Sequence, residues 1–187
     1  MKALLDANVL YPTVLREILI GVAREELFTP IWSDRILEEW ARATVKLGPG
    51  AEIIARGEIS VLRSDFPRAS VMPPDGLADR LWLPDPNDIH VLAAAVFAGA
   101  DLIVTSNAQD FPRHILAEEH LDRRDPDQFL LMLFDKDRNK VGAVVERVRA
   151  EAERLSGVPQ PCRALLKRAG LPRLAKALEQ KGAWKSD

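Results

Sequence analysis

Short apolar runs that end at acidic or amide residues constrain the fold of this chain more than any other feature. Lys2-Ala-Leu-Leu ends at Asp6, and Leu102-Ile-Val-Thr105 is followed closely by Asn107 and Asp110. Each run is too short for a helix, and the second is rich in the branched apolar residues typical of a buried strand. The chain between them shows mostly helical spacing. Strands separated by helices predict an α/β fold, in which helices flank a parallel sheet.

Apolar spacing and helix-ending residues locate the expected elements. Strands are expected at 2–5, 28–32, 71–72 and 102–105, and helices at 12–23, 34–44, 51–64, 88–98, 127–134 and 141–155, with two short helices after 161. In the third of these helices we expect Ile53, Ile54, Val61 and Leu62 to face the core. Asn87 or Asp88 is placed to cap the next helix, which Gly99 is expected to end with a positive φ.

Composition excludes several classes of protein. The chain has 187 residues, 47% of them apolar, which is enough for a sizeable core. Its single cysteine allows no internal disulfide, and no Cys/His spacing suggests a zinc site. No apolar run approaches the roughly 20 residues of a membrane span, and Asp6 interrupts any signal-peptide region. We therefore expect a cytoplasmic protein that does not associate with membranes.

The net charge of -2 conceals an uneven distribution along the chain. Residues 1–135 carry a balance of -9, whereas residues 136–187 carry +7. Such asymmetry indicates an acidic body with a basic C-terminal segment. The basic segment could pack on the body or contact a polyanion. Its last part, around Gly170, fits an amphipathic helical hairpin better than a DNA-binding helix-turn-helix.

Acidic and amide side chains recur where the strands are expected to end. Asp6, Asn107 and Asp110 follow strands, and Asp85 and Asp88 precede the helix that leads to the last strand. Each alone is an ordinary cap or turn residue. Several of them at one sheet edge would repel one another unless a cation neutralised them. Oxygen ligands without His or Cys favour Mg²⁺ or Mn²⁺, ions that serve phosphoryl chemistry.

The motifs resemble those of PIN-domain ribonucleases. Leu-Leu-Asp6-Ala-Asn-Val-Leu opens the chain, and Trp-Ser-Asp-Arg-Ile-Leu-Glu-Glu39-Trp follows. Asp85-Pro-Asn-Asp88-Ile-His-Val-Leu-Ala-Ala-Ala then precedes Gly-Ala-Asp-Leu-Ile-Val-Thr-Ser-Asn107-Ala-Gln-Asp110-Phe. In this order the four motifs resemble the VapC-type toxins of bacterial type II toxin–antitoxin systems, in a longer subgroup with a helical C-terminal extension. The resemblance covers residues 2–135 well and the extension loosely.

The resemblance assigns expected roles to individual carboxylates. It implies that Asp6 and Asp88 bind Mg²⁺ or Mn²⁺ directly, and that Glu39 reaches the metal through water. Helical spacing alone does not distinguish Glu38 from Glu39, and the family pattern favours Glu39.

The last acidic position departs from the family pattern. Many members have Asp where this chain has Asn107, and Asp110 follows three residues later. We expect Asp110 to bind the metal and Asn107 to act through water, because an amide offers a carbonyl oxygen but no charge. Whether one or two ions bind is left open.

Three residues are candidates for orienting these ligands by hydrogen bonds: Asn8, Asp85 and Thr105. For Asn8 a turn or cap role is an equal alternative, and Asp85 is also an ordinary turn starter. His90 is expected to be a surface or packing residue, because two helical positions turn it by about 200° from Asp88.

Together these features predict a PIN-like nuclease domain at 1–135 and a basic helical extension at 136–187. The expected reaction is metal-assisted hydrolysis of RNA phosphodiester bonds by an endoribonuclease toxin. The expected partners are an RNA substrate and a cognate antitoxin, with self-association possible in principle. One alternative is a non-catalytic PIN-fold module that binds RNA or protein, and another is a stand-alone RNA-processing nuclease. A haloacid-dehalogenase-type phosphatase is disfavoured, because it needs a second Asp where Asn8 stands.

Overall fold

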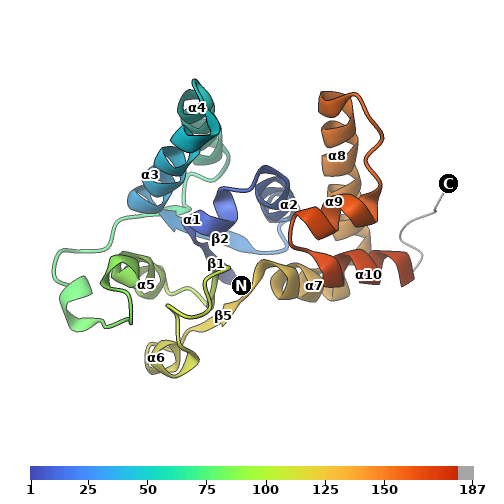
Figure 1. The fold of residues 1–187 in the computed structure, drawn as a ribbon. Helices are drawn as coiled ribbons and strands as arrows, with labels where there is room; N and C mark the ends of the chain where they lie inside the picture. The colour runs from blue at the N-terminus through green and yellow to red at the C-terminus, as the bar shows by residue number, and fades with distance from the viewer. Residues whose placement is uncertain (181–187) are drawn as a thin grey trace. The chain divides into compact units, whose positions relative to one another are not determined.

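A five-stranded, fully parallel sheet organises the chain in the computed structural model, which describes residues 1–180 (Figure 1). Its strand order is β3-β2-β1-β4-β5. The strands are β1 (Lys2–Leu5), β2 (Thr29–Ser33), β3 (Ser70–Val71), β4 (Leu102–Val104) and β5 (Asp122–Arg124). In the centre, Leu4 lies opposite Ile31 on one side and Ile103 on the other. The carboxyl ends of β1 and β4 therefore meet at one edge. The four expected strands are confirmed within one or two residues, and β5 was not expected.

The chain folds into two compact units. The first comprises Met1–Tyr11 and Phe28–Arg124, and the second Pro12–Leu27 and the chain from Asp125 onward. The first holds the sheet, the helices α1 (Ala7–Leu10), α3 (Asp34–Ala43), α4 (Ala51–Asp65), α5 (Ile89–Ala98) and α6 (Arg113–Glu118), and the 3₁₀ turns η1 (Thr44–Leu47), η2 (Ala78–Arg80) and η3 (Pro86–Asp88). The second holds α2 (Thr13–Arg24), α7 (Pro126–Lys136), α8 (Arg138–Ser156), α9 (Cys162–Arg168) and α10 (Pro172–Gln180).

Helix α5 anchors the core of the first unit. It contacts β1, β2 and β3, and its residues from Val91 to Ala95 are all buried. Burial of Val91 and Leu92 contributes about 1.5–3 kcal/mol each. The three alanines that follow let the helix backbone approach the strands closely. Gly99 ends the helix at φ 58°, as expected from its position.

Helix α4 presents a different face to the core from the one that the sequence predicts. Its buried residues are Ala55, Ile59 and Leu62. By contrast, Ile53 and Ile54 are 77% and 66% exposed, and Val61 is also exposed. The expectation was therefore right for Leu62 and wrong for the other three. The spacing of Ala55, Ile59 and Leu62 sets the inward face, and alanine counts toward it as much as isoleucine does.

The second unit consists of helices within its described part. Helix α2 packs on α8, and α10 packs on α7 and α9. The α9–α10 turn includes Gly170 at φ 78°, in agreement with the expected hairpin. Buried Asp127 of α7 accepts hydrogen bonds from the backbone N–H groups of Arg173 (2.8 Å) and Leu174 (2.9 Å) at the start of α10. No helix within residues 1–180 is both long and apolar enough to cross a bilayer.

Several arginines of this unit form ion pairs with its own carboxylates. Arg149 contacts Glu146 (2.7 Å) and Glu153 (2.6 Å), and Arg163 contacts Glu179 (2.9 Å). Pairs as exposed as the Arg163 pair contribute only about 0–1 kcal/mol each. Part of the positive charge seen in the sequence is thus locally neutralised.

We expect Gly21→Ala to destabilise the protein, because α2 and α8 approach closely at this position. A Cβ at Gly21 would lie 2.5 Å from Val144 Cγ1. Overpacking costs about 1–3 kcal/mol, which outweighs the roughly 1 kcal/mol that alanine gains over glycine in a helix. Urea unfolding measures the change. Adding Val144→Ala should make the Gly21 substitution much less costly. Equal costs in both backgrounds would contradict the close approach.

Candidate metal centre

Asp6 lies at the carboxyl end of β1 and is only 6% exposed. Its Oδ1 accepts a hydrogen bond from the Ala7 N–H (2.7 Å), so the side chain caps α1. Its Oδ2 accepts a hydrogen bond from the Thr105 hydroxyl (2.8 Å) at the end of β4. The position predicted for the first carboxylate is therefore tied to both central strands.

Asn8 links the ends of β1 and β4 more closely still. Its amide nitrogen donates hydrogen bonds to Asp6 and to Thr105 Oγ1 (3.0 Å). Its carbonyl oxygen accepts a hydrogen bond from the Ser106 N–H (3.0 Å). These contacts fit the orienting role that the sequence suggests for Asn8 and Thr105. The Asn8 amide nitrogen thus contacts Asp6 after β1, and its oxygen contacts Ser106 after β4. The orientation of the Asp6 carboxylate therefore depends on the pairing of the two strands.

Asp85 and Asp88 lie at the other side of the site, before α5. Asp85 Oδ1 accepts hydrogen bonds from Asn87, at 2.9 Å from the backbone nitrogen and 3.0 Å from the side-chain nitrogen, and so caps η3. Asp88 occupies the N-cap position of α5, but its side chain makes no capping hydrogen bond. The expected cap by Asn87 or Asp88 is therefore wrong. Asp85 caps the preceding 3₁₀ turn, which leaves the Asp88 carboxylate available to the site.

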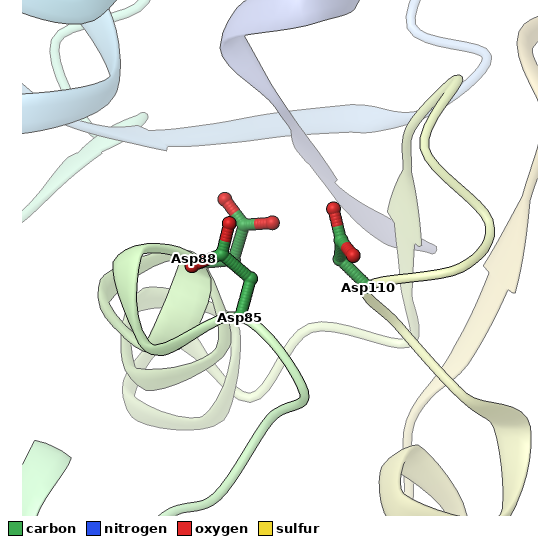
Figure 2. A group of neighbouring side chains, drawn as sticks. All are labelled: Asp85, Asp88 and Asp110. Carbon is green, nitrogen blue, oxygen red and sulfur yellow. The ribbon is translucent and has the colours of Figure 1, made fainter.

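Three aspartates bring their carboxylates together. One oxygen from each of Asp85, Asp88 and Asp110 lies within 4.8 Å of the other two. Figure 2 shows Asp85 and Asp88 at the start of α5, facing Asp110 from the loop after β4. An all-oxygen set of this kind fits Mg²⁺ or Mn²⁺ and does not suit a metal that prefers nitrogen or sulfur. Asp85, expected only to support the ligands, thus lies among them.

The electrostatics of the site connect this cluster to the other predicted carboxylates. Burial raises the pKa of Asp88 to about 6, and repulsion adds to this increase. The repelling groups are Asp6, Asp110, Asp85 and Glu39. Burial also raises the pKa of Asp6, although the hydrogen bonds from Thr105, Ala7 and Asn8 oppose the increase. A divalent cation would offset this repulsion, so the charge pattern also fits a metal.

Glu39, on α3, is held by two neighbours. Its Oε1 lies 3.1 Å from Arg35 Nε, one turn earlier on the helix, and 2.9 Å from His90 Nε2 on α5. Burial raises the pKa of Glu39, and nearby Asp6 adds to the increase. Glu38 points elsewhere and pairs with Arg42 and Arg56. The geometry thus distinguishes Glu39 from Glu38, which helical spacing alone did not.

His90 was predicted to be a surface or packing residue, and its contact with Glu39 was missed. Its side chain is 13% exposed, and burial lowers its pKa to about 4. The ring is therefore neutral at pH 7, and its Nε2–H donates to Glu39. Its Nδ1 is buried without a hydrogen-bond partner among the described residues. The Nε2 contact falls within the packing alternative of that prediction and identifies Glu39 as the partner.

Asn107 and Asp110 interact directly. The amide of Asn107 donates a hydrogen bond to Asp110 Oδ2, and its backbone N–H donates to Thr105 Oγ1 (3.0 Å). The second contact holds the start of the loop against the end of β4. Asn107 thus orients the Asp110 carboxylate in this structure.

Two models of known protein families match parts of the chain. A family model described as a PIN domain matches residues 2–109, which is more than half of the chain. A model described as the VapC50 C-terminal domain matches residues 126–180. Searches of curated proteins and of solved structures gave no match.

Proposed function

The chain belongs to the PIN-domain family, in its VapC-type group of nuclease toxins, and from this premise we propose that it is a metal-dependent endoribonuclease. The observation that carries the proposal is the group of three aspartate oxygens within 4.8 Å at the carboxyl edge of the sheet. We further propose that it acts in the cytoplasm as the toxin of a pair and is inhibited by a cognate antitoxin. Residues 1–135 would hold the nuclease and residues 136–187 the basic extension.

The chain's own residues would divide the work at this edge. Asp88 and Asp110, with Asp6 and Asp85 beside them, would hold Mg²⁺ or Mn²⁺. Bound there, such an ion supplies Lewis-acid chemistry, which activates water and stabilises the negative charge that develops on the phosphate.

Other residues of the site would position these groups and the water. Asn8 and Thr105 orient Asp6, and Asn107 orients Asp110 through their hydrogen bonds. Glu39, held by Arg35 and His90, would position the attacking water.

Cleavage of RNA by the purified protein tests the proposal. We expect internal cuts in a structured RNA when Mg²⁺ or Mn²⁺ is present, and none after chelation by EDTA. Absence of cleavage with either ion, together with retained RNA binding, would favour the non-catalytic module. Cleavage without growth arrest on expression would favour a stand-alone RNA-processing nuclease.

We expect His90→Leu to lower kcat about 10- to 100-fold with little change in KM, because the hydrogen bond to Glu39 is lost. His90→Gln keeps an N–H donor and should restore part of the rate. Steady-state cleavage kinetics give both constants, and thermal melting shows whether each variant folds. If the Leu and Gln variants lost equal activity, His90 would be a packing residue as first expected.

A further inference from the structure

A pocket of about 300 Å³ lies in the first unit, and the site described above does not use it. Its apolar part is formed by Leu81, by Leu92 of α5 and by Ile115 of α6, and Trp82 stands at its wall. This volume is at the lower end of the range for ligand pockets. It suits a single flat ring system better than a length of polymer.

Trp82 is the large aromatic side chain that this pocket offers to solvent. The indole is 62% exposed, whereas its neighbours Leu81 and Leu83 are 7% and 1% exposed. Burial on both sides of Trp82 fixes the local backbone, and the alternation directs the indole outward. Two other tryptophans, Trp32 and Trp40, are completely or almost completely buried. An exposed indole held by buried neighbours provides a rigid surface on which a base can stack.

The polar edge of the pocket is formed by Arg80, His114, Glu118 and Glu119. Its two carboxylates against one guanidinium favour a hydrogen-bond donor over an anion. Arg80 forms a two-pronged ion pair with Glu119, at 2.6 and 3.0 Å, and its charge is thereby neutralised. Glu118 also lines the pocket and has no ion-pair partner within residues 1–180. A phosphate placed there would meet an unpaired carboxylate. A base with an exocyclic amino group would instead donate a hydrogen bond to it.

The pocket adjoins the carboxylates along the chain. Trp82 precedes Asp85 by three residues, which can span at most about 11 Å. Leu92 follows Ile89, the first residue of α5 and the neighbour of Asp88, by three residues, a rise of about 4.5 Å along the helix. A nucleotide close to a phosphate at the carboxylates can therefore place its base in this pocket.

We propose that this pocket binds one nucleobase of the RNA, stacked on Trp82 with its exocyclic amino group donating to Glu118. The proposal rests on the proposed function for its ligand, and it adds a base preference to a site that otherwise contacts only phosphate. Cytosine, with an amino group, should bind better than uracil, which has a carbonyl oxygen at the same position.

Binding of oligocytidylate and oligouridylate of equal length tests the proposal. The full-length chain carries Asp88→Asn, so that RNA is not cut, and binding is followed by fluorescence anisotropy in Mg²⁺. Trp82→Ala should weaken binding about tenfold, whereas Trp82→Phe keeps a ring for stacking and should weaken it much less. Oligocytidylate should bind about fivefold more tightly, and Glu118→Gln should reduce this preference. Phe97→Ala removes another exposed aromatic ring, at the far end of α5, and should change nothing.

Two results would overturn the proposal. One is a loss of RNA affinity in Trp82→Ala no larger than the loss in Phe97→Ala, and the other is equal affinity for the two oligonucleotides. Failure of the nuclease proposal is separately visible, because cleavage is assayed with the unsubstituted chain. If Trp82→Ala loses RNA binding and the unsubstituted chain does not cleave RNA, the nuclease proposal is rejected and the pocket proposal stands. If the unsubstituted chain cleaves RNA and Trp82→Ala binds RNA as tightly as before, the pocket proposal is rejected and the nuclease proposal stands.

Discussion

Asp6→Asn is expected to reduce RNA cleavage at least about a hundredfold and to relieve growth arrest on expression, because it removes one of the carboxylate charges that would hold the metal ion. The substitution keeps the shape of the side chain. One carboxylate oxygen accepts from the Ala7 N–H and the other from Thr105 and Asn8, so the asparagine amide must face one of these donors. Thr105 Oγ1 already accepts hydrogen bonds from Asn8 and Asn107, so one donor loses its acceptor, and thermal melting shows whether the variant still folds. Cleavage of a labelled RNA and growth after induction measure the two effects.

Asp101→Asn is the matched control for this experiment. Asp101 precedes β4, at the opposite edge of the sheet from Asp6, and its Oδ2 accepts a hydrogen bond from the Lys2 N–H (2.6 Å). Asparagine can keep that bond, and the same charge is removed far from the site. We expect this variant to cleave RNA and to stop growth like the original protein. Equal toxicity of Asp6→Asn and the original chain would contradict the mechanism.

The central strands and their acidic ends could be predicted because local signals determine them. Lys2–Leu5 and Leu102–Val104 are apolar runs that only a buried strand can accommodate at such length. Once both are parallel neighbours, Asp6 and Asp110 must emerge at one edge. The pairing of these two strands joins residues that lie far apart in the sequence, and it came from the structure.

Elements without an apolar pattern were not predictable in this way. β5, with the sequence Asp-Arg-Arg, is a strand because its backbone pairs with β4, and its side chains carry no strand signal. Helix α6 is only six residues long, which is fewer than two helical turns, so its apolar spacing does not repeat often enough to predict a helix. In α4, large residues at Ile53 and Ile54 concealed an inward face that begins with Ala55.

The details of the site depend on local backbone geometry that residue spacing does not reveal. Asp85 caps η3, and this frees the Asp88 carboxylate. One signal for the Glu39 neighbourhood was present in the sequence, since Arg35 lies four residues earlier on the same helix. The contact of Glu39 with His90 joins two helices and required the tertiary structure.

Adding Mg²⁺ or Mn²⁺ is expected to raise the melting temperature, because the ion binds the folded carboxylate cluster. At about 100 times the dissociation constant, binding stabilises by about 2.7 kcal/mol. For a chain of this size, that corresponds to an increase of about 5–10 °C. Relief of the repulsion around Asp88 acts in the same direction. Differential scanning fluorimetry across a metal titration measures the shift.

Asp88→Asn should reduce this shift to about half or less, because a tenfold loss of affinity removes about 1.4 kcal/mol of the stabilisation. Asp101→Asn should keep the full shift. The metal-free Asp88→Asn protein should itself melt higher than the metal-free original, since it lacks one of the mutually repelling charges. A full shift in Asp88→Asn would place the metal away from residue 88.

The contribution of Asp88 to the stability of the metal-free protein should also depend on pH in a defined direction. The pKa of Asp88 is raised from 3.8 to about 6 in the folded state, so between these values the folded state binds more protons than the unfolded state. Asp88 therefore lowers the free energy of unfolding as pH rises through this window, whereas His90, with its pKa lowered to about 4, raises it. Burial raises the pKa values of Asp6 and Glu39 as well, which adds to the same trend as Asp88. The contribution of Asp88 is the difference in free energy of unfolding between the original chain and Asp88→Asn, and this difference should fall as pH rises from about 4 to about 6.

Metal binding should show the opposite pH dependence, because protons and the ion compete for the same oxygens. The metal-induced increase in melting temperature should be largest above about pH 6 and should shrink below it. In Asp88→Asn the metal-induced increase should depend less on pH, and the metal-free protein should lose the decrease in stability that Asp88 contributes between about pH 4 and 6. Melting curves across this pH range, with and without Mn²⁺, test both trends in one experiment. A difference in metal-free stability between the original chain and Asp88→Asn that stays constant from about pH 4 to pH 6 would contradict the clustering of these carboxylates in the folded protein.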